Sequence, residues 1–274
     1  MTRWAAFAGV TLAVLFLLLV LARLSQSVVT GTYVTREERR WLDRLPDGAD
    51  HLDSQSAPTP RKSPAESTLE PDREPSTVAL LANVSVSQGF FALLLLGGAW
   101  LAEVPASALG VASDPLSTGL PALAAGIAAG VGLTFGNALA GGLAERFNGD
   151  PSEELRALLS PETTGGWVLL LGVVLPIIAG FEELLFRAAL VGAFSVGFGV
   201  SPWALVAFSS VAFALGHGAQ GTLGVIVTGL LGAALGAVFV LTNSLLAVVV
   251  AHYLVNAVEF VVGEGLEWRP FSPE

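Results

Sequence analysis

The chain has 274 residues, of which 53% are hydrophobic and only 13% charged. Soluble domains usually carry about 25% charged residues, so this composition excludes an ordinary soluble domain and indicates a membrane protein. The absence of cysteine excludes disulfides and thiolate metal sites. The net charge of -10 and the lack of a basic patch argue against binding to nucleic acid.

The first predicted element is an apolar stretch over residues 4–22, which is long enough to cross the hydrocarbon layer. A cleaved signal peptide is the alternative, but Ala22-Arg23-Leu24-Ser25 is a poor cleavage site. We therefore interpret residues 1–23 as an uncleaved transmembrane helix.

Residues 24–77 differ sharply from their surroundings because they combine mixed charges with several prolines. Such a segment buries too little apolar surface to offset its ordering entropy, so we interpret it as a linker. Residues 35–45 are expected to form a short interfacial helix within it. Residues 46–76 are predicted to be dispensable for folding of the rest.

Further apolar segments follow, and backbone inside lipid must satisfy its own hydrogen bonds, so each is predicted to be a helix. The segment 184–200 has two interpretations, a full span or a re-entrant piece. The predicted fold is therefore an all-α transmembrane bundle of seven or eight helices, followed by a C-terminal tail over 264–274. The segments are 78–102, 120–143, 166–181, 184–200, 203–217, 222–241 and 244–263.

Two patterns refine this bundle. Glycines at small-xxx-small spacing predict close helix packing. The sequence Asp150-Pro151-Ser152-Glu153 has the cap, proline and acidic residue typical of a helix start, which predicts a short surface helix. The glycines are Gly126, Gly130, Gly132, Gly136, Gly232 and Gly236.

Charged residues inside an apolar span are costly and are therefore functional candidates. Glu182, Glu183 and Arg187 lie within such a region. Glu183 and Arg187 are four residues apart, so they share a helix face and are predicted to pair. Glu182 points about 100° away from Glu183, which leaves its carboxylate available to handle a proton or water.

Two of the three histidines also lie in or at the end of apolar spans, at His217 and His252. Asn256 shares a helix face with His252, and its amide could donate a hydrogen bond to an oxyanion. Taken singly, each polar cluster is more typical of helix packing than of catalysis. Their presence together in one membrane domain favours a catalytic site.

These clusters resemble the three ordered motifs of the CAAX protease and bacteriocin-processing family of membrane proteases, which includes prenyl-protein endopeptidases. The resemblance covers about residues 78–263, with its specific part in 180–256, and residues 1–77 lie outside it. The matching motifs are Glu182-Glu183-xxx-Arg187, Phe213-xxx-His217 and His252-xxx-Asn256.

The resemblance implies an intramembrane endopeptidase that acts on a peptide or protein substrate, which can itself be membrane-anchored. Glu182 would activate water, with Glu183 and Arg187 in support. His217 would help to hold the water or a metal, and His252 with Asn256 would bind metal or stabilise the oxyanion. Two mechanisms stay open, a zinc-dependent one and a metal-independent one.

A zinc site would draw on Glu182, His217 and His252, which come from three different helices. No His-Glu-x-x-His motif of the soluble zinc proteases is present. The sequence therefore predicts the residues of a three-ligand site without deciding between the two mechanisms.

Arginines follow the first span, so the positive-inside rule predicts an external N-terminus and an internal linker. One long span over 166–191 would place Glu182 and His217 at opposite membrane surfaces. Pro176 and Gly180 suggest instead that the span ends near Glu182 and that 184–200 crosses separately. This arrangement favours eight helices and a site toward the outer side of what we expect to be the cell membrane.

The alternative functions are a proton- or ion-coupled transporter and a protease-like scaffold that does not cleave. Intramembrane glutamate and histidine also mark ion pathways, but the paired repeats common in transporters are not evident. A scaffold is disfavoured because every expected catalytic residue type is present. The substrate, and whether it is prenylated, cannot be deduced from the sequence.

Overall fold

The computed structural model describes residues 1–42, 77–148, 156–157 and 159–266, and for 25–42 and 140–148 it describes only the helical backbone. Within these ranges the regular structure is entirely helical. The expected surface helix starting at Asp150 and the expected linker from residue 43 to 76 lie outside the described residues.

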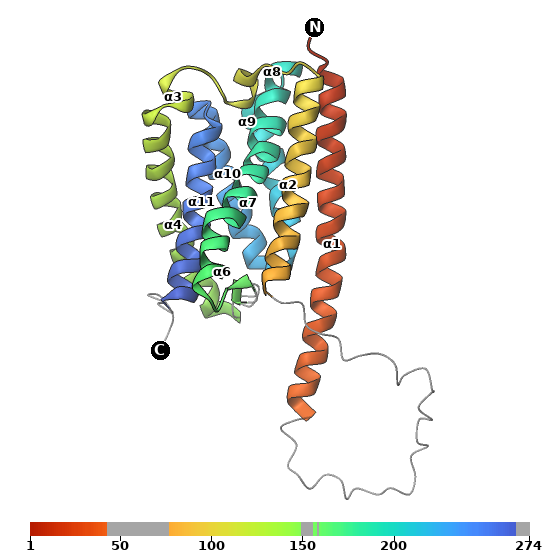
Figure 1. Cartoon of the computed structure of the whole chain (residues 1–274), viewed down its shortest axis with the longest axis vertical. Helices are drawn as coiled ribbons and strands as arrows, with labels where there is room; N and C mark the ends of the chain where they lie inside the picture. Colours follow the sequence, from red (N-terminus) through yellow and green to blue (C-terminus); the bar gives the residue numbers. More distant parts are fainter. Residues whose placement is uncertain (43–76, 149–155, 158, 267–274) are drawn as a thin grey trace, which may run out of the picture.

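Long helices run up and down through the bundle, and short helical turns connect them (Figure 1). The N-terminus lies at one end of the bundle, and the C-terminal end of α11 lies at the other. The helices outside residues 164–198 are α1 (Trp4–Leu42), α2 (Thr77–Leu101), η3 (Ala106–Leu109), α3 (Pro115–Thr118), α4 (Leu120–Asn148), α9 (Pro202–Gly216), η6 (Gly218–Gln220), α10 (Gly221–Thr242), α11 (Leu245–Phe260) and η7 (Val261–Gly265).

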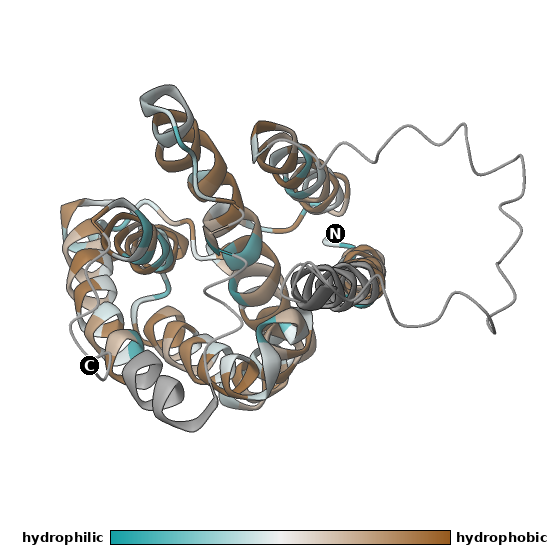
Figure 2. Cartoon of the chain, turned by 90° about the horizontal axis from the view of Figure 1, so that it is seen from below, coloured by the Kyte–Doolittle hydropathy of each residue, from teal (hydrophilic) through white to brown (hydrophobic). Residues whose placement is uncertain are grey.

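Six helices in the described part of the chain are long and apolar enough to cross a membrane, and α9 is a shorter apolar helix. Many large hydrophobic residues are exposed on the outside of the bundle. Figure 2 shows that hydrophobic residues predominate along the helices. A helix that is apolar on its outward face is stable only where the surroundings are lipid. The chain is therefore an integral, multi-pass membrane protein, and the predicted all-α transmembrane bundle is confirmed.

Residues 164–198 form one continuous helical run of 35 residues, which we call the central helix. Its successive parts are α6 (Thr164–Leu169), η4 (Leu170–Val174), α7 (Leu175–Glu183), η5 (Leu184–Ala193) and α8 (Phe194–Phe198), of which η4 and η5 are wider π-helical turns. The predicted separation into two crossings at 166–181 and 184–200 is therefore wrong.

The π-turn η4 explains why Pro176 does not break the helix. A proline inside a helix removes one backbone donor and crowds the preceding turn. The π-turn η4 lies immediately before α7, and it widens the backbone where the proline ring needs room. The helix therefore continues past Pro176, and Gly199 ends it in a left-handed conformation with φ of 67°.

The N-terminal helix is longer than predicted. α1 extends from Trp4 to Leu42, although its apolar, membrane-spanning part is Trp4–Leu24. The helical backbone therefore runs through most of the segment 35–45 that was expected to form a separate interfacial helix.

The glycine pattern on α4 has two different outcomes. A Cβ at Gly126 would lie 2.6 Å from the Ala247 carbonyl oxygen, and one at Gly130 would lie 3.0 Å from Leu254, so these glycines allow close packing on α11. Added Cβ atoms at Gly132 and Gly136 would meet nothing within 4 Å. Two of the four predicted packing glycines on α4 therefore have open space beside them.

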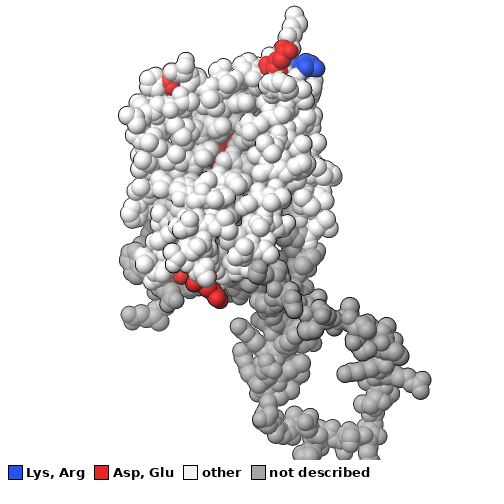
Figure 3. Space-filling view, viewed as in Figure 1, with Lys and Arg blue, Asp and Glu red and all other residues white. Residues whose placement is uncertain are grey.

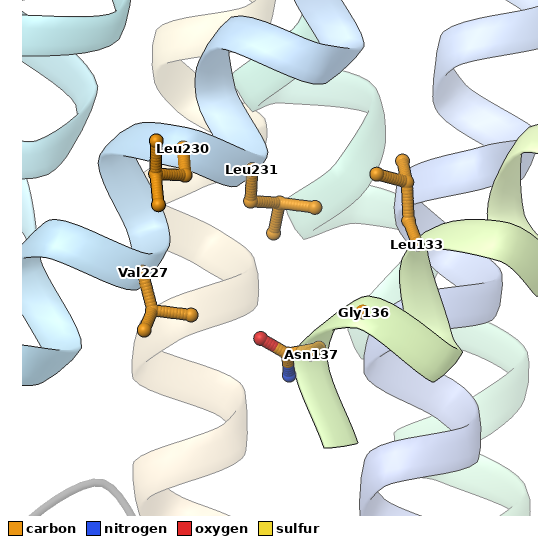
Figure 4. A pocket seen from close by; sticks show the side chains of 6 residues that line it. All are labelled: Leu133, Gly136, Asn137, Val227, Leu230 and Leu231. Atoms are coloured by element: carbon orange, nitrogen blue, oxygen red, sulfur yellow. The ribbon is translucent and has the colours of Figure 1, made fainter. Parts of the chain in front are cut away.

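A small cavity of about 100 Å³ lies between α4 and α10 (Figure 4). Its single polar side chain is that of Asn137, which lies opposite Val227 and Leu231. None of the predicted site residues lines it. The complete lining is Leu133, Gly136, Asn137, Val227, Leu230 and Leu231.

Candidate active site

The Glu183–Arg187 pair predicted from its spacing is present at the centre of the bundle. Arg187 Nη1 donates to Glu183 Oε1 at 2.9 Å, and the two side chains are 0% and 1% exposed. Arg187 Nη2 also donates to the Gly232 carbonyl oxygen on α10, at 3.0 Å. Because both charges are buried, each needs the other to offset its desolvation.

His252 of α11 lies between the two carboxylates of the central helix. Its Nδ1 donates to Glu183 Oε1 at 2.6 Å, and its Nε2 lies 3.6 Å from Glu182 Oε2. Glu183 therefore accepts from both Arg187 and His252 through one oxygen, while its Oε2 is buried without a partner among the described residues. His252 thus joins a fixed carboxylate on one side to a second carboxylate on the other.

The two neighbouring glutamates have different surroundings. Glu183 is fully buried, whereas Glu182 keeps an exposed fraction of 8% and has no partner beyond His252 in the described structure. Figure 3 shows charged atoms gathered at the two ends of the molecule and a small acidic area visible in an opening at mid-height. Glu182 is therefore the carboxylate that a ligand or water can reach.

Phe213 of α9 connects the two histidines and the arginine. Its ring lies 4.6 Å from the His217 ring and 6.0 Å from the His252 ring, measured between centroids. The Arg187 guanidinium carbon lies 4.9 Å from the centre of the same ring, a cation–π contact. The sequence indicated no role for Phe213 beyond its place in a motif, because an aromatic residue in an apolar span ordinarily packs in the core.

His217 lies at the end of α9, where its Nδ1 donates to the Phe213 carbonyl oxygen at 2.8 Å. This bond uses the proton on Nδ1, so the Nε2 of the neutral ring is the acceptor. His217 makes no hydrogen bond to either glutamate in the described structure. Phe213 is what places it in the site.

Glu182 and His217 lie at a similar depth in the bundle, but for a different reason from the one predicted. α9 has only 15 residues, so it ends inside the bundle. At a rise of about 1.5 Å per residue, Glu182 and His217 each lie about 20–25 Å from the turn that joins α8 to α9. One long central helix is therefore compatible with a shared site, because its neighbour is short.

Asn256 lies one turn beyond His252 on α11 and is half-buried. It makes no hydrogen bond within the described part of the chain. Glu259, farther along the same helix, pairs instead with Arg156. The polar residues of α11 therefore serve two places: His252 lies in the site, and Glu259 lies nearer the end of the bundle.

Glu182, His217 and His252, which the sequence suggested as metal ligands, are not gathered into a three-ligand group among the described residues. Nδ1 of His252 bonds to Glu183 and Nδ1 of His217 bonds to the Phe213 carbonyl oxygen, so Nε2 is the nitrogen that each ring leaves outside these bonds. Among the described residues, no group of three His, Asp or Glu side chains has the arrangement of a metal site.

Two contacts at the site had no signal in the sequence. Gly232 supplies its carbonyl to Arg187, and an added Cβ there would lie 3.2 Å from the Phe213 ring. Ser209 of α9 donates to the Phe186 carbonyl oxygen of η5 at 2.7 Å. The small-residue spacing indicated that Gly232 packs closely, but not that it binds the arginine.

The comparison with protein families gives one match. Residues 164–258, about a third of the chain, match the model of the type II CAAX prenyl endopeptidase Rce1-like family. This segment is an Rce1-like domain. It contains all six predicted site residues, and the family resemblance stated from the motifs is confirmed.

Neither the curated proteins nor the solved structures contain a match to the chain. The family implies a protease, and therefore a peptide or protein substrate. At the level of the family, the match supports a CAAX-protease-like endopeptidase embedded in the membrane.

Proposed function

We propose that the chain hydrolyses a peptide bond within the membrane by using water activated by Glu182. The observation that carries the proposal is the position of His252 between Glu182 and Glu183, with Glu182 alone partly accessible. Two adjacent carboxylates with such different partners can take different chemical roles.

In this mechanism, a water molecule beside Glu182 loses a proton to that carboxylate and attacks the carbonyl carbon of the substrate. Asn256, one turn beyond His252, donates its amide N–H to the developing oxyanion, and His252 adds a second donor there when both of its ring nitrogens carry protons. Glu182 then returns the proton to the departing nitrogen, and the peptide bond breaks. The free Nε2 of His217 orients the attacking water.

Glu183 and Arg187 act through His252 in this scheme. Glu183 accepts the hydrogen bond from the Nδ1–H of His252 and thereby fixes the orientation of the ring. Arg187 holds Glu183 in place and is itself held by Gly232 and the Phe213 ring. The buried ion pair is thus a support for the reactive groups.

The test is cleavage of internally quenched peptides by purified protein in lipid vesicles. The Glu182→Gln variant should lose activity by about 100-fold or more, the usual scale for removing a general base. Glu162→Gln is the matched control, because Glu162 is an exposed glutamate outside the site. A Glu182→Gln protein with full activity would disprove the proposal.

The same assay addresses the metal and the substrate. A chelator should leave the activity unchanged if Glu182 and His252 act without a metal, and a loss restored by zinc would overturn this part of the proposal. Peptides ending in a CAAX sequence, with and without a prenyl group, should be compared with internal cleavage sequences. We propose that an apolar, membrane-anchored peptide is the preferred class.

A further inference from the structure

In the central helix, the backbone carbonyl of Leu171 lacks the N–H donor that would continue the π-turn. In the π-turn η4, the Leu175 N–H bonds to the Leu170 carbonyl. The next carbonyl, that of Leu171, would receive its π-type bond from residue 176, which is a proline without an N–H. A carbonyl oxygen inside a membrane bundle requires a partner from elsewhere.

Tyr253 supplies that partner. Its hydroxyl donates to the Leu171 carbonyl oxygen at 3.2 Å, across the interface between α11 and the central helix. Its ring packs against an apolar cluster that includes Leu175. Tyrosine commonly uses its apolar ring and polar tip together in this way.

Tyr253 directly follows His252, so α11 is attached to the central helix at two neighbouring residues. His252 bonds to Glu183 on the C-terminal side of Pro176, and Tyr253 bonds to Leu171 on its N-terminal side. The two attachments restrain both the rotation and the sliding of α11 at the point where His252 enters the site.

We propose that Tyr253 is a positioning residue, whose hydroxyl holds His252 between the two glutamates by binding the carbonyl that Pro176 leaves free. The proposal rests on the proposed function for its kinetic consequences. Its structural part, the placement of the His252 ring, is independent of any activity.

The first experiment measures peptide cleavage by Tyr253→Phe, which keeps the ring and removes only the hydroxyl. Misplacement of a reacting group by a fraction of an ångström is costly, so kcat should fall about 10- to 100-fold. KM should change less than about twofold, because no contact with substrate is removed. The control is Thr134→Val, because the Thr134 hydroxyl bonds only within its own helix, to Gly130.

The second experiment observes His252 directly. The chain has three histidines, so ¹⁵N-histidine labelling gives few NMR signals, and His51→Gln and His217→Gln assign them. Tyr253→Phe should shift or broaden the Nδ1–H signal of His252, and Thr134→Val should leave it unchanged. An unchanged signal in Tyr253→Phe would overturn the proposal, even if the protein unfolds at a lower temperature.

The third experiment tests the role of Pro176. Pro176→Ala restores an N–H that can bond to the Leu171 carbonyl, which makes the tyrosine hydroxyl redundant. In that background, Tyr253→Phe should lower kcat less than about threefold. Equal losses in both backgrounds would show that the free carbonyl is not what Tyr253 serves.

These outcomes separate the two proposals. If the unaltered protein cleaves no peptide, the proposed function fails. The NMR signal of His252 in Tyr253→Phe, with and without Pro176→Ala, then still decides whether Tyr253 positions the ring.

Discussion

The central helix and α4 are two membrane spans whose sequences give a misleading impression of their places in the fold. The central helix contains two glutamates and an arginine, yet its most apolar 18-residue stretch has a mean hydropathy of 2.2, against 1.5 for the span Leu120–Leu139 of α4. In that stretch 50% of the residues are buried inside the protein, whereas 17% are buried in the corresponding stretch of α4. Mean hydropathy therefore does not distinguish a span that faces lipid from one that forms the core.

The two helices differ in the residues that interrupt their apolar sequences and in the contacts that those residues need. The central helix carries charges and π-turns, and neighbouring helices supply partners for them, from Gly232, His252, Tyr253 and Ser209. α4 carries glycines, which need only a close neighbour on one side. A helix with charged side chains or unpaired backbone groups is therefore more stable in the core, because lipid offers these groups no hydrogen-bond partner.

Glu183→Gln should produce the largest loss of stability, because it leaves Arg187 buried without its carboxylate. Removing one partner of a buried pair costs about 3–5 kcal/mol, measured here as the loss in free energy of unfolding. The double variant Glu183→Gln with Arg187→Met should recover part of this loss. If Glu182→Gln is instead the unstable protein and Glu183→Gln is stable but inactive, the roles of the two carboxylates are reversed.

Two glycines of α4 should respond oppositely to the same change. Gly126→Ala places a Cβ about 2.6 Å from the Ala247 carbonyl oxygen, so α4 and α11 must separate, at a cost of about 1–3 kcal/mol. Gly132→Ala meets no atom within 4 Å and should be neutral or slightly stabilising. Thermal unfolding in detergent compares the two, and equal losses would contradict the assigned faces of α4.

Gly232→Ala should have a smaller effect on stability than Gly126→Ala, because the nearest atoms belong to side chains. Its Cβ would lie 3.2 Å from the Phe213 ring and 3.6 Å from Arg187 Nη2. We expect a cost of about 1 kcal/mol, since side chains give way more easily than backbone. Peptide cleavage should fall as well, because Phe213 contacts both histidines, and Gly132→Ala provides the control with unchanged cleavage.

Phe135→Leu should have the smallest effect. Phe135 lies on α4 with 67% of its surface exposed, so in the membrane it contacts lipid. Replacing one apolar side chain by another at such a position should change the free energy of unfolding by less than about 0.5 kcal/mol. A loss as large as that of Gly126→Ala would show that this face of α4 packs against protein, such as a second copy of the chain.

The sequence by itself determined the class of the protein and the composition of its site. Long uncharged segments predicted a helical membrane bundle, because only helices and closed barrels satisfy their backbone in lipid. The spacing of Glu183 and Arg187 predicted their ion pair, because residues four apart share a helix face. The three ordered motifs predicted the family. These inferences depend on local geometry or on composition, which the sequence contains directly.

The tertiary structure alone decided how the parts meet. It made one helix of residues 164–198, because a π-turn accommodates Pro176, and it placed His217 in the site because α9 is short. It also assigned the partners of Arg187 and of the Leu171 carbonyl, which lie on α10 and α11. Such contacts join residues tens of positions apart, and they follow from the packing of helices, which no local pattern specifies.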